Sequence, residues 1–341
     1  MNSFTNDYSE GAHPSILKAL AKANLEQNDG YGLDIHSLQA TKLIREHVGD
    51  DKAEVIYLSG GTQTNQLAIS CALRPHMACI AATTGHIAVH ETGAIEATGH
   101  KVVTVEPIDG KLTPELIEPV LVDHYFEHMV LPKMVYISNP TELGTVYNKK
   151  ELEDLYSFCQ NKGLILYCDG ARLGCALDAE KGKLTLQDIY NNTDAFFIGG
   201  TKIGALLGEA LVIKKAEMKE DIRYLTKQRG ALLAKGSLLG IQFETLMSNG
   251  LYAELSRKTN AGAQKIVKAM KELGFQFLLS SPTNQIFPIL DNALIEKLEK
   301  KYAFYVWEKM DNQQSAIRLV TSWATPEQQI DQFIEDLKNL Q

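Results

Sequence analysis

Short apolar runs alternate with helix-like segments through the middle of the chain. Seven of these runs are expected to form strands, at residues 54–58, 79–82, 102–105, 134–138, 164–168, 195–198 and 209–213. The alternation is typical of parallel β-α-β units with helices on both faces of the sheet. Ligands of such sheets bind beyond the carboxyl ends of the strands. We therefore predict an α/β fold whose functional residues directly follow its strands.

One of these strands is followed by a lysine. The apolar run at 196–198 ends in Gly199-Gly200, and Thr201 and Lys202 come next. Lysine seldom follows a buried strand this closely, because burying an ammonium group costs free energy. It is useful there when the amine must be neutral and nucleophilic, as in a Schiff base with pyridoxal 5'-phosphate (PLP). The alternative is a solvent-exposed lysine in a loop.

An aspartate ends a second strand. The apolar run at 164–168 leads directly into Asp169 and Gly170. PLP requires an acid at its pyridine nitrogen, because the protonated ring accepts electrons from the reacting carbon. Asp169 alone could be a turn or capping residue. Its pairing with Lys202 favours the PLP site.

A glycine-rich turn follows the first strand. Gly60 and Gly61 lead into a helix that is expected to start near Thr62. The N-terminus of a helix presents unpaired N–H groups and a positive dipole end, which suit a phosphate group. The turn is neither a Walker loop nor a complete Gly-x-Gly-x-x-Gly motif. An ordinary strand-to-helix turn is the alternative, but the phosphate site, the aspartate and the lysine together describe one cofactor.

Over nearly its whole length the chain resembles PLP enzymes of the aspartate aminotransferase fold type, and among them the low-specificity threonine aldolases. The motifs that carry the resemblance are Asn6-Asp7-Tyr8, Gly30-Tyr31-Gly32, residues 60–65, residues 85–93, residues 169–172, Gly200-Thr201-Lys202 and residues 317–321. The resemblance implies fold type I, in which a large PLP-binding α/β domain with a mostly parallel sheet carries a smaller α+β C-terminal domain. The expected domains are an N-terminal arm with helices (1–45), the large domain (46–248) and the small domain (249–341).

The resemblance also implies a set of residues around the cofactor. These are Gly60, Gly61, Thr62, His86, Asp169, Arg172, Thr201, Lys202 and Lys235. His86 is expected to stack on the pyridine ring and could move the proton of a substrate hydroxyl, with Glu91 as its partner. The alternative for His86 is a hydrogen-bonded loop histidine.

Lys235 shares a basic segment with Lys227 and Arg229. In similar enzymes, basic residues of this segment reach the phosphate of the neighbouring subunit's cofactor. The resemblance therefore implies a homodimer or homotetramer with shared active sites. The sequence does not choose among the three basic residues, and an ordinary solvated face is the alternative.

An arginine lies inside an expected strand near the C-terminus. Arg318 interrupts the apolar run 317–320, which is unusual unless the guanidinium meets an anion. A guanidinium matches a carboxylate through two hydrogen bonds, so Arg318 is expected to hold the substrate α-carboxylate. An edge-strand arginine that extends into solvent is the alternative. Arg172, which could also reach the cofactor's phenolate oxygen, and by resemblance Asn6 and Tyr31 are the other candidate substrate contacts.

The sequence departs from the family in one loop. Many of these aldolases have a histidine in a Glu-Asn-Thr-His-Asn-Gly loop, a candidate base for the substrate β-hydroxyl. Here residues 138–145 form a loop that is one residue longer and has no histidine. Glu142 or Thr141 could replace it, as could a water held by His86.

The composition limits the partners. Of 341 residues, 45% are hydrophobic and 22% charged, and the net charge of −8 disfavours nucleic acid. No apolar run is long enough to span a membrane and no signal peptide is evident, so a cytoplasmic protein is expected. The five cysteines are expected to be small core residues, and no metal site is expected.

These observations predict a PLP-dependent carbon–carbon lyase. Its expected reaction is retro-aldol cleavage of L-threonine or L-allo-threonine to glycine and acetaldehyde, with Lys202 holding the cofactor and Asp169 protonating its ring. The alternatives are β-elimination or transamination on the same fold, a non-catalytic PLP-binding protein, and a nucleotide-dependent enzyme.

Overall fold

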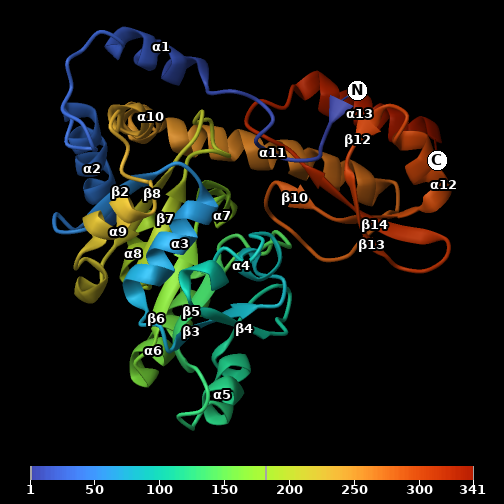
Figure 1. Cartoon of the computed structure of the whole chain (residues 1–341). Coiled ribbons are helices and arrows are strands. Elements are labelled where there is room, and N and C mark those ends of the chain that lie inside the picture. Colours follow the sequence, from blue (N-terminus) through green and yellow to red (C-terminus); the bar gives the residue numbers. More distant parts are fainter. Residues whose placement is uncertain (1, 181–182, 341) are drawn as a thin grey trace.

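The computed structural model describes residues 2–180 and 183–340. Its central element is a seven-stranded sheet with the strand order β2-β8-β7-β6-β5-β3-β4 (Figure 1). The strands are β2 (Glu54–Leu58), β3 (Met77–Ala82), β4 (Lys101–Val105), β5 (Leu131–Ser138), β6 (Ile165–Asp169), β7 (Ala195–Gly199) and β8 (Glu209–Ile213). The seven strands expected from the sequence are all present, and β2 and β8 have the expected bounds.

The sheet is mostly parallel, as expected for the fold class, but β8 is an exception. It runs antiparallel to both β2 and β7, whereas β3 pairs in parallel with β4 and β5, and β6 pairs in parallel with β5 and β7. Only residues 200–208 connect β7 to β8. A parallel crossover needs a dozen or more residues, so this connection has to reverse the chain. The β-α-β pattern expected over residues 54–213 therefore does not extend to β8, which agrees with the mostly parallel sheet of the expected fold class.

Helices cover both faces of this sheet. They include α3 (Gly61–Ala72), α4 (His86–Val89), α5 (Pro114–Asp123), α6 (Lys149–Lys162), α7 (Leu173–Ala179), α8 (Leu186–Asn191) and α9 (Ile222–Gln228), with 3-10 turns η1 (Glu96–Thr98) and η2 (Ala216–Met218). Alternate residues of β7 enter different cores: Phe196 and Ile198 pack on one face, and Phe197 packs on the other. Alternation of this kind, apolar on both sides, is typical of a buried central strand.

The N-terminal segment and the last helices of the central region lie at one end of the sheet. They are α1 (Pro14–Ala23), α2 (Ile35–Val48) and α10 (Ser237–Met247). Helix α2 begins where expected, because the Asp34 carboxylate accepts a hydrogen bond from the Ser37 N–H (2.8 Å). Helix α10 begins six residues later than the expected start at residue 231, and α1 is shorter than the expected 12–27.

The rest of the chain forms a second, smaller sheet beside the first (Figure 1). It follows the long helix α11 (Leu251–Glu272) and comprises β9 (Gln276–Phe277), β10 (Gln285–Ile286), β11 (Pro288–Asp291), β13 (Tyr305–Lys309) and β14 (Gln314–Val320), with helices α12 (Asn292–Leu298) and α13 (Glu327–Leu340). All its strand pairs are antiparallel. The single strand expected at 285–289 is interrupted at Phe287, and both of its parts pair with β14.

The N-terminal arm crosses from one sheet to the other. Its first residues, β1 (Asn2–Ser3), pair in parallel with β12 (Tyr302–Ala303), and Phe4 is fully buried in the core of the second sheet. The arm then passes the carboxyl edge of the first sheet on its way to α1. This path buries Asp7 between Arg172 of the first sheet's region and Asn284 of the second, while the Tyr8 side chain stays exposed.

Three further observations concern the described residues 2–180 and 183–340. None of their helices combines the length and the apolar character needed to cross a membrane. No group of three or more His, Cys, Asp or Glu side chains in them could hold a metal ion. All five cysteines are free thiols, and all but Cys71 are buried.

Candidate active site

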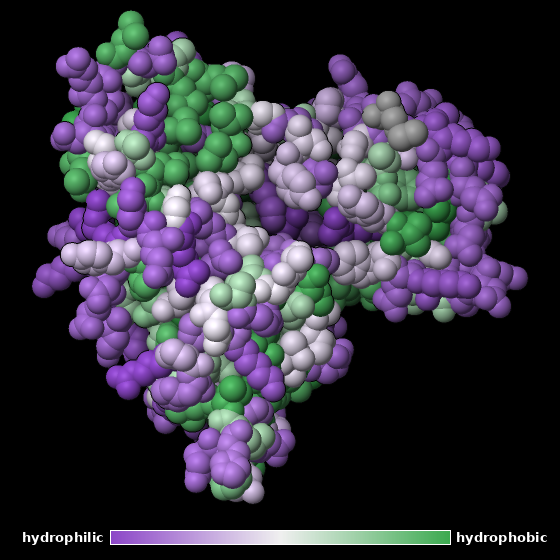
Figure 2. Space-filling model, viewed as in Figure 1, coloured by the Kyte–Doolittle hydropathy of each residue, from purple (hydrophilic) through white to green (hydrophobic). Residues whose placement is uncertain are grey.

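A pocket of about 310 Å³ opens at the carboxyl ends of the parallel strands. It lies where Figure 2 shows a hollow lined by hydrophilic residues near the centre of the molecule. Its walls are Tyr8, Ser59, Gly60, Gly61, Thr62, His86, Ser138, Pro140, Thr141, Glu142, Asp169, Ala171, Arg172, Thr201, Lys202 and Glu209. Eight of the residues expected to contact the cofactor are among them: all of that set except Lys235.

Close contact between the ends of β6 and β7 brings Asp169 and Lys202 to this pocket. The Gly199 N–H donates to the Gly170 carbonyl oxygen (2.9 Å). A side chain on Gly170 would overlap the backbone oxygen of Phe197, and one on Gly199 would overlap the backbone oxygen of Ala171. Both positions therefore require glycine, and the two strand ends can approach only because neither carries a Cβ.

Lys202 has an unusual environment for a lysine. Its side chain lines the pocket, and within residues 2–180 and 183–340 it forms no ion pair or hydrogen bond that would hold a charge. Burial lowers the pKa of Lys202, and the nearby Arg172 guanidinium lowers it further, although the carboxylates of Asp7, Asp169 and Glu209 partly offset this. The amine is therefore more readily neutral than an exposed lysine, as a nucleophile must be.

Asp169 is held in one orientation by three hydrogen bonds. Its Oδ2 accepts from the Tyr136 hydroxyl (2.7 Å) and from the Asn65 amide (3.1 Å), and its Oδ1 accepts from the Ala171 N–H (3.0 Å). The residue is only 5% exposed. A buried carboxylate with this number of donors is held in a fixed orientation. Asn65 and Tyr136 have a positioning role that the sequence did not reveal.

A chain of hydrogen bonds connects Asp169 to His86. Asn65 donates to both Asp169 and Glu91 Oε1 (2.8 Å), and His86 Nδ1 lies 2.9 Å from the same Glu91 oxygen. Burial lowers the pKa of His86, but the hydrogen bond with Glu91 and the charge of Asp169 outweigh this, so its pKa lies above the usual value. Glu91 therefore fixes the ring of His86, the partnership that the sequence suggested.

Glu142 lies beside His86 in the loop that lacks the family histidine. Its Oε1 accepts from the backbone N–H of His86 (2.8 Å) and from the Ser138 hydroxyl (2.7 Å). Burial raises the pKa of this carboxyl group, although the two donors moderate the effect. Thr141 lines the same pocket, and its hydroxyl is bonded to the Thr145 hydroxyl (2.7 Å).

The N-terminus of α3 forms one wall. Gly60 is the N-cap residue and offers no side-chain cap, so the first N–H groups of the helix have no intrahelical acceptor. Ser59, the residue before the N-cap, donates its N–H and hydroxyl to the Gln63 side chain (3.2 and 2.9 Å). The wall that Gly60, Gly61 and Thr62 provide is thus suited to an anion.

The two candidate arginines differ in how far they are already paired. Arg172 lines the pocket but donates from Nε and Nη2 to Asp7 Oδ2 and Oδ1 (2.6 and 3.0 Å). The Asn284 amide also donates to Asp7 Oδ2 (2.9 Å). Arg318 is not among the pocket residues. Its Nη2 donates to the Thr5 carbonyl oxygen (3.3 Å), while its buried Nε has no acceptor among the described residues. Its guanidinium lies over the rings of Tyr305 and Trp307, 5.3 Å from each centroid.

Three other expected residues lie outside this pocket in the single chain. Asn6 accepts hydrogen bonds from Tyr8 and Ser9 through its side chain, and so stabilises the arm. Tyr31 is 43% exposed and lies under the Lys227 ammonium group (4.9 Å). Lys235 is exposed, and Arg229 donates to the Ser70 hydroxyl of its own chain (3.0 Å).

Comparison with known proteins identifies the family. The family model described as "Beta-eliminating lyase" matches residues 5–293, most of the chain. This chain belongs to the beta-eliminating lyase family. The family and its fold are those of PLP-dependent enzymes.

Several relatives of this chain are threonine aldolases by name. The structure of Leishmania major threonine aldolase is 49% identical, covers 100% of this chain and 99% of its own, and has a TM-score of 0.98. The low specificity L-threonine aldolase of a Pseudomonas species is 29% identical over 98% of this chain and 96% of its own length. The similarity to threonine aldolases, inferred from motifs, is thereby confirmed, and with it the expected class of PLP-dependent lyase.

A more distant structure supports the fold alone. Thermus thermophilus aspartate aminotransferase is 16% identical, covers 99% of this chain and 91% of its own, and has a TM-score of 0.73. The fold type that the motifs implied is therefore confirmed for this chain.

Proposed function

We propose that this chain cleaves the Cα–Cβ bond of β-hydroxy amino acids, and that it converts L-threonine or L-allo-threonine into glycine and acetaldehyde. The observation that carries the proposal is Lys202, an unpaired lysine with a lowered pKa, in one pocket with the rigidly held carboxylate of Asp169. The choice of reaction is based on the relatives, which are named threonine aldolases.

The pocket fits PLP on the chemistry of its donors. The unpaired first-turn N–H groups at Gly61 and Thr62 suit its phosphate, the Asp169 carboxylate suits its pyridine nitrogen, and the Lys202 amine suits its aldehyde. Thr201 and Arg172 line the same space. When bound, PLP supplies an electron sink for bond cleavage next to an amino-acid Cα.

Protons at the substrate hydroxyl are assigned to the adjacent pair His86 and Glu142. His86 uses Nδ1 to contact Glu91, which leaves Nε2 as the nitrogen available to a substrate. Glu142 is the second proton acceptor, because burial raises its pKa towards the neutral range in which a base works well. His86 is the first choice, because an imidazole titrates closest to neutral pH.

The substrate carboxylate is assigned to Arg318. Its guanidinium is oriented by two aromatic rings and has a buried N–H without an acceptor, whereas Arg172 has two of its N–H groups on Asp7. An unpaired buried donor favours an incoming anion. A fixed carboxylate sets which bond at Cα is aligned for cleavage. Asn6 and Tyr31 are retained as further substrate contacts.

We also propose a homodimer or homotetramer in the cytoplasm, built of the arm (1–45), the large domain (46–248) and the small domain (249–341). Apolar side chains gather on the surface around α1 in Figure 2, and Leu17, Leu25, Leu33, Ile35 and Leu38 are exposed there or close by in the chain. An exposed apolar area of this kind is typical of an interface. Lys235, exposed on this chain, would then reach a neighbouring subunit's phosphate.

Product analysis tests the reaction directly. Purified protein loaded with PLP and given L-threonine should release acetaldehyde and glycine in equal amounts, measured by coupled reduction of the aldehyde and amino-acid chromatography. Ammonia with 2-oxobutanoate would show β-elimination instead, and accumulation of the aminated cofactor would show transamination. Either result would overturn the proposed cleavage but not the PLP site.

A further inference from the structure

A second buried acid lies beside Lys202. Glu209 is the first residue of β8, where it pairs with Gly199 at the end of β7 and with Leu58 at the end of β2. It is only 4% exposed, yet it lines the same pocket as Lys202. Nothing in the reaction proposed above uses this carboxyl group. A buried glutamate is costly unless it is paired, so its presence needs an explanation.

The side-chain hydrogen bonds of Glu209 both come from the turn that carries Lys202. Its Oε2 accepts from the Gly200 N–H (3.0 Å), and its Oε1 contacts the Thr201 hydroxyl (2.9 Å). Among residues 2–180 and 183–340, no lysine, arginine or histidine lies within ion-pair distance of this carboxyl group. The buried Glu209 and the partly buried Lys202 thus line one pocket without an ion pair between them.

Transfer of one proton would remove both unpaired charges. An ammonium group on Lys202 and a carboxylate on Glu209 would become a neutral amine and a carboxylic acid, with no other reactant needed. Burial raises the pKa of Glu209, and burial together with the Arg172 charge lowers the pKa of Lys202, so both shifts favour the neutral pair. The other titratable groups that interact with Lys202 are Asp7, Asp169, His86, His90 and Cys175. Those that interact with Glu209 are Asp169 and Tyr252.

The hydroxyl of Thr201 can satisfy Glu209 in either state. Towards a carboxylate it donates its proton to Oε1. Towards a carboxylic acid it can accept, because its own proton can turn to the Gly208 carbonyl oxygen, 3.4 Å away. The Gly208 N–H donates to the same hydroxyl oxygen (3.0 Å) and keeps it in place. The turn is therefore built to tolerate a proton on Glu209.

We propose that Glu209 holds the proton that Lys202 would otherwise carry, so that the cofactor-free site contains a carboxylic acid and a neutral, nucleophilic amine. Glu209 acts through Lys202 and is a positioning residue rather than a catalytic one. The location of this proton does not depend on the proposed function. Its role, which is to leave the Lys202 amine free to attack the PLP aldehyde, does rest on the proposed function.

Infrared spectroscopy of the full-length chain, freed of cofactor, tests where the proton resides. At neutral pH we expect a carboxylic-acid carbonyl band that shifts when glutamate is labelled with ¹³C and disappears as the pH is raised. The band should be absent in Glu209→Gln and retained in Glu142→Gln, which removes the other buried glutamate of the pocket. Absence of a ¹³C-sensitive acid band from the wild-type chain would overturn the proposal, even if the Gln variant does not fold.

The reactivity of Lys202 gives a second, independent readout. Acetic anhydride acetylates only neutral amines, and peptide mass spectrometry reports Lys202 against the exposed Lys18. Glutamine resembles the protonated acid, so Glu209→Gln should leave Lys202 as reactive at pH 7 as in the wild type. A tenfold or greater increase in the variant would overturn the proposal, because an ionised Glu209 would then have held Lys202 as ammonium. If the proposed function is wrong, the chain would not bind PLP. The infrared band and the acetylation of Lys202 would then still give the results expected for a proton on Glu209.

Discussion

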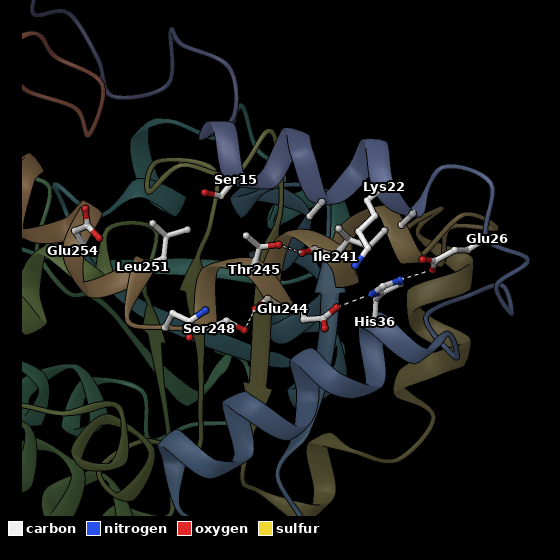
Figure 3. Close-up of a pocket in the computed structure, with 13 residues that line it drawn as sticks. Ser15, Lys22, Glu26, His36, Ile241, Glu244, Thr245, Ser248, Leu251 and Glu254 are labelled. Carbon is white, nitrogen blue, oxygen red and sulfur yellow. Dashed lines mark hydrogen bonds and ion pairs between the residues drawn. The ribbon is translucent and has the colours of Figure 1, made fainter.

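Two clusters of charged groups in this molecule differ in how their charges are paired. In the first, the His36 imidazole lies between two carboxylates, with Nδ1 2.6 Å from Glu244 and Nε2 2.8 Å from Glu26, as Figure 3 shows. In the second, Lys202 faces Asp169 and Glu209 without an ion pair in the described part of the chain. Carboxylates on both sides stabilise a protonated, charged side chain. Burial without an ion-pair partner instead favours its neutral form.

Cavity size does not distinguish the two places. The groove beside His36 has a volume of about 440 Å³, and the pocket at Lys202 has about 310 Å³. In the groove, His36, Glu26 and Glu244 are paired with one another, and Lys22 and Glu254 also line it. The pocket collects groups whose pKa values are shifted by burial and by one another, which is typical of a reactive site. The comparison predicts that substitutions in the pocket change activity and that substitutions in the groove change stability.

The largest effect is expected for Lys202→Ala. The variant should lose both turnover and the visible absorbance that depends on the lysine-bound cofactor, because no other amine of the described residues lines the pocket. Absorbance spectra with and without added PLP, together with an aldehyde assay, measure both losses. A borohydride-reducible cofactor adduct at another lysine would show that the assignment is wrong.

Lys214→Ala is the matched control for that loss. Burial lowers the pKa of Lys214 to about 8, yet its ammonium group donates to the Asn191 carbonyl oxygen (2.8 Å) and lies over the Tyr156 ring, away from the pocket. This variant should retain cofactor and activity. Both lysines have a lowered pKa, but only Lys202 lines the pocket. Comparing the two variants therefore shows whether activity depends on the position of the lysine or only on its lowered pKa.

The next effect concerns the proton at the substrate hydroxyl. His86→Asn should reduce kcat about 10²–10⁴-fold, the range for loss of a general acid–base group. His90→Asn is the control, because the His90 ring is a neighbour of the His86 ring (5.5 Å between centroids) but does not line the pocket. A small decrease in kcat for His86→Asn together with a severe decrease for Glu142→Gln would show that the base is Glu142, in the loop at 138–145.

Arg318→Lys is expected to have a smaller effect. Lysine supplies the charge but not the two-pronged geometry that the Tyr305 and Trp307 rings hold in place, so KM should rise and kcat should fall, by about 10²-fold together. Steady-state kinetics with threonine measures both constants. Arg45→Lys is the control, since Arg45 donates from Nε to the Ala53 carbonyl oxygen (2.9 Å) outside the pocket. Unchanged constants for Arg318→Lys would assign the carboxylate to Arg172.

Local sequence predicted much of the fold and the centre of the site. The strands at 54–58 and 209–213 and the helix at 35–48 have the expected bounds, because a short apolar run or a capping aspartate determines them within a few residues. Lys202 and Asp169 are candidates because a charged residue after a buried strand is unusual, and both line one pocket. The direction of β8 was missed, although the short connection at 200–208 excludes a crossover.

The parts that could not be predicted depend on contacts between distant residues. Arg172 is paired with Asp7, from a different part of the chain, and this pairing changes which arginine is free for a substrate. The orientation of Asp169 depends on Tyr136, whose hydroxyl is visible in the sequence only as part of an apolar strand. Glu209 likewise reads as an ordinary residue at the start of a strand until β8 is placed beside β7.

The smallest expected effect is in the groove of Figure 3, where a histidine contributes to stability. Burial lowers the pKa of His36, but its hydrogen bonds to Glu26 and Glu244 outweigh this, so the folded-state pKa lies above the unfolded value of about 6.5. A raised pKa means that the folded protein binds the proton more tightly. The stabilisation is therefore complete below about pH 6.5 and is lost as the pH rises through the folded-state pKa.

His36→Gln should accordingly reduce the free energy of unfolding at pH 6, on the order of 1 kcal/mol with solvent screening allowed for, and by less at pH 9. Urea unfolding at the two pH values measures the difference, and activity at pH 7 should be unchanged because the groove is separate from the pocket. His124→Gln is the control, since His124 Nδ1 contacts the Val120 carbonyl oxygen rather than a carboxylate. An equal loss at both pH values would show that His36 acts through packing, and a loss of activity would show that the groove and the Lys202 pocket are coupled.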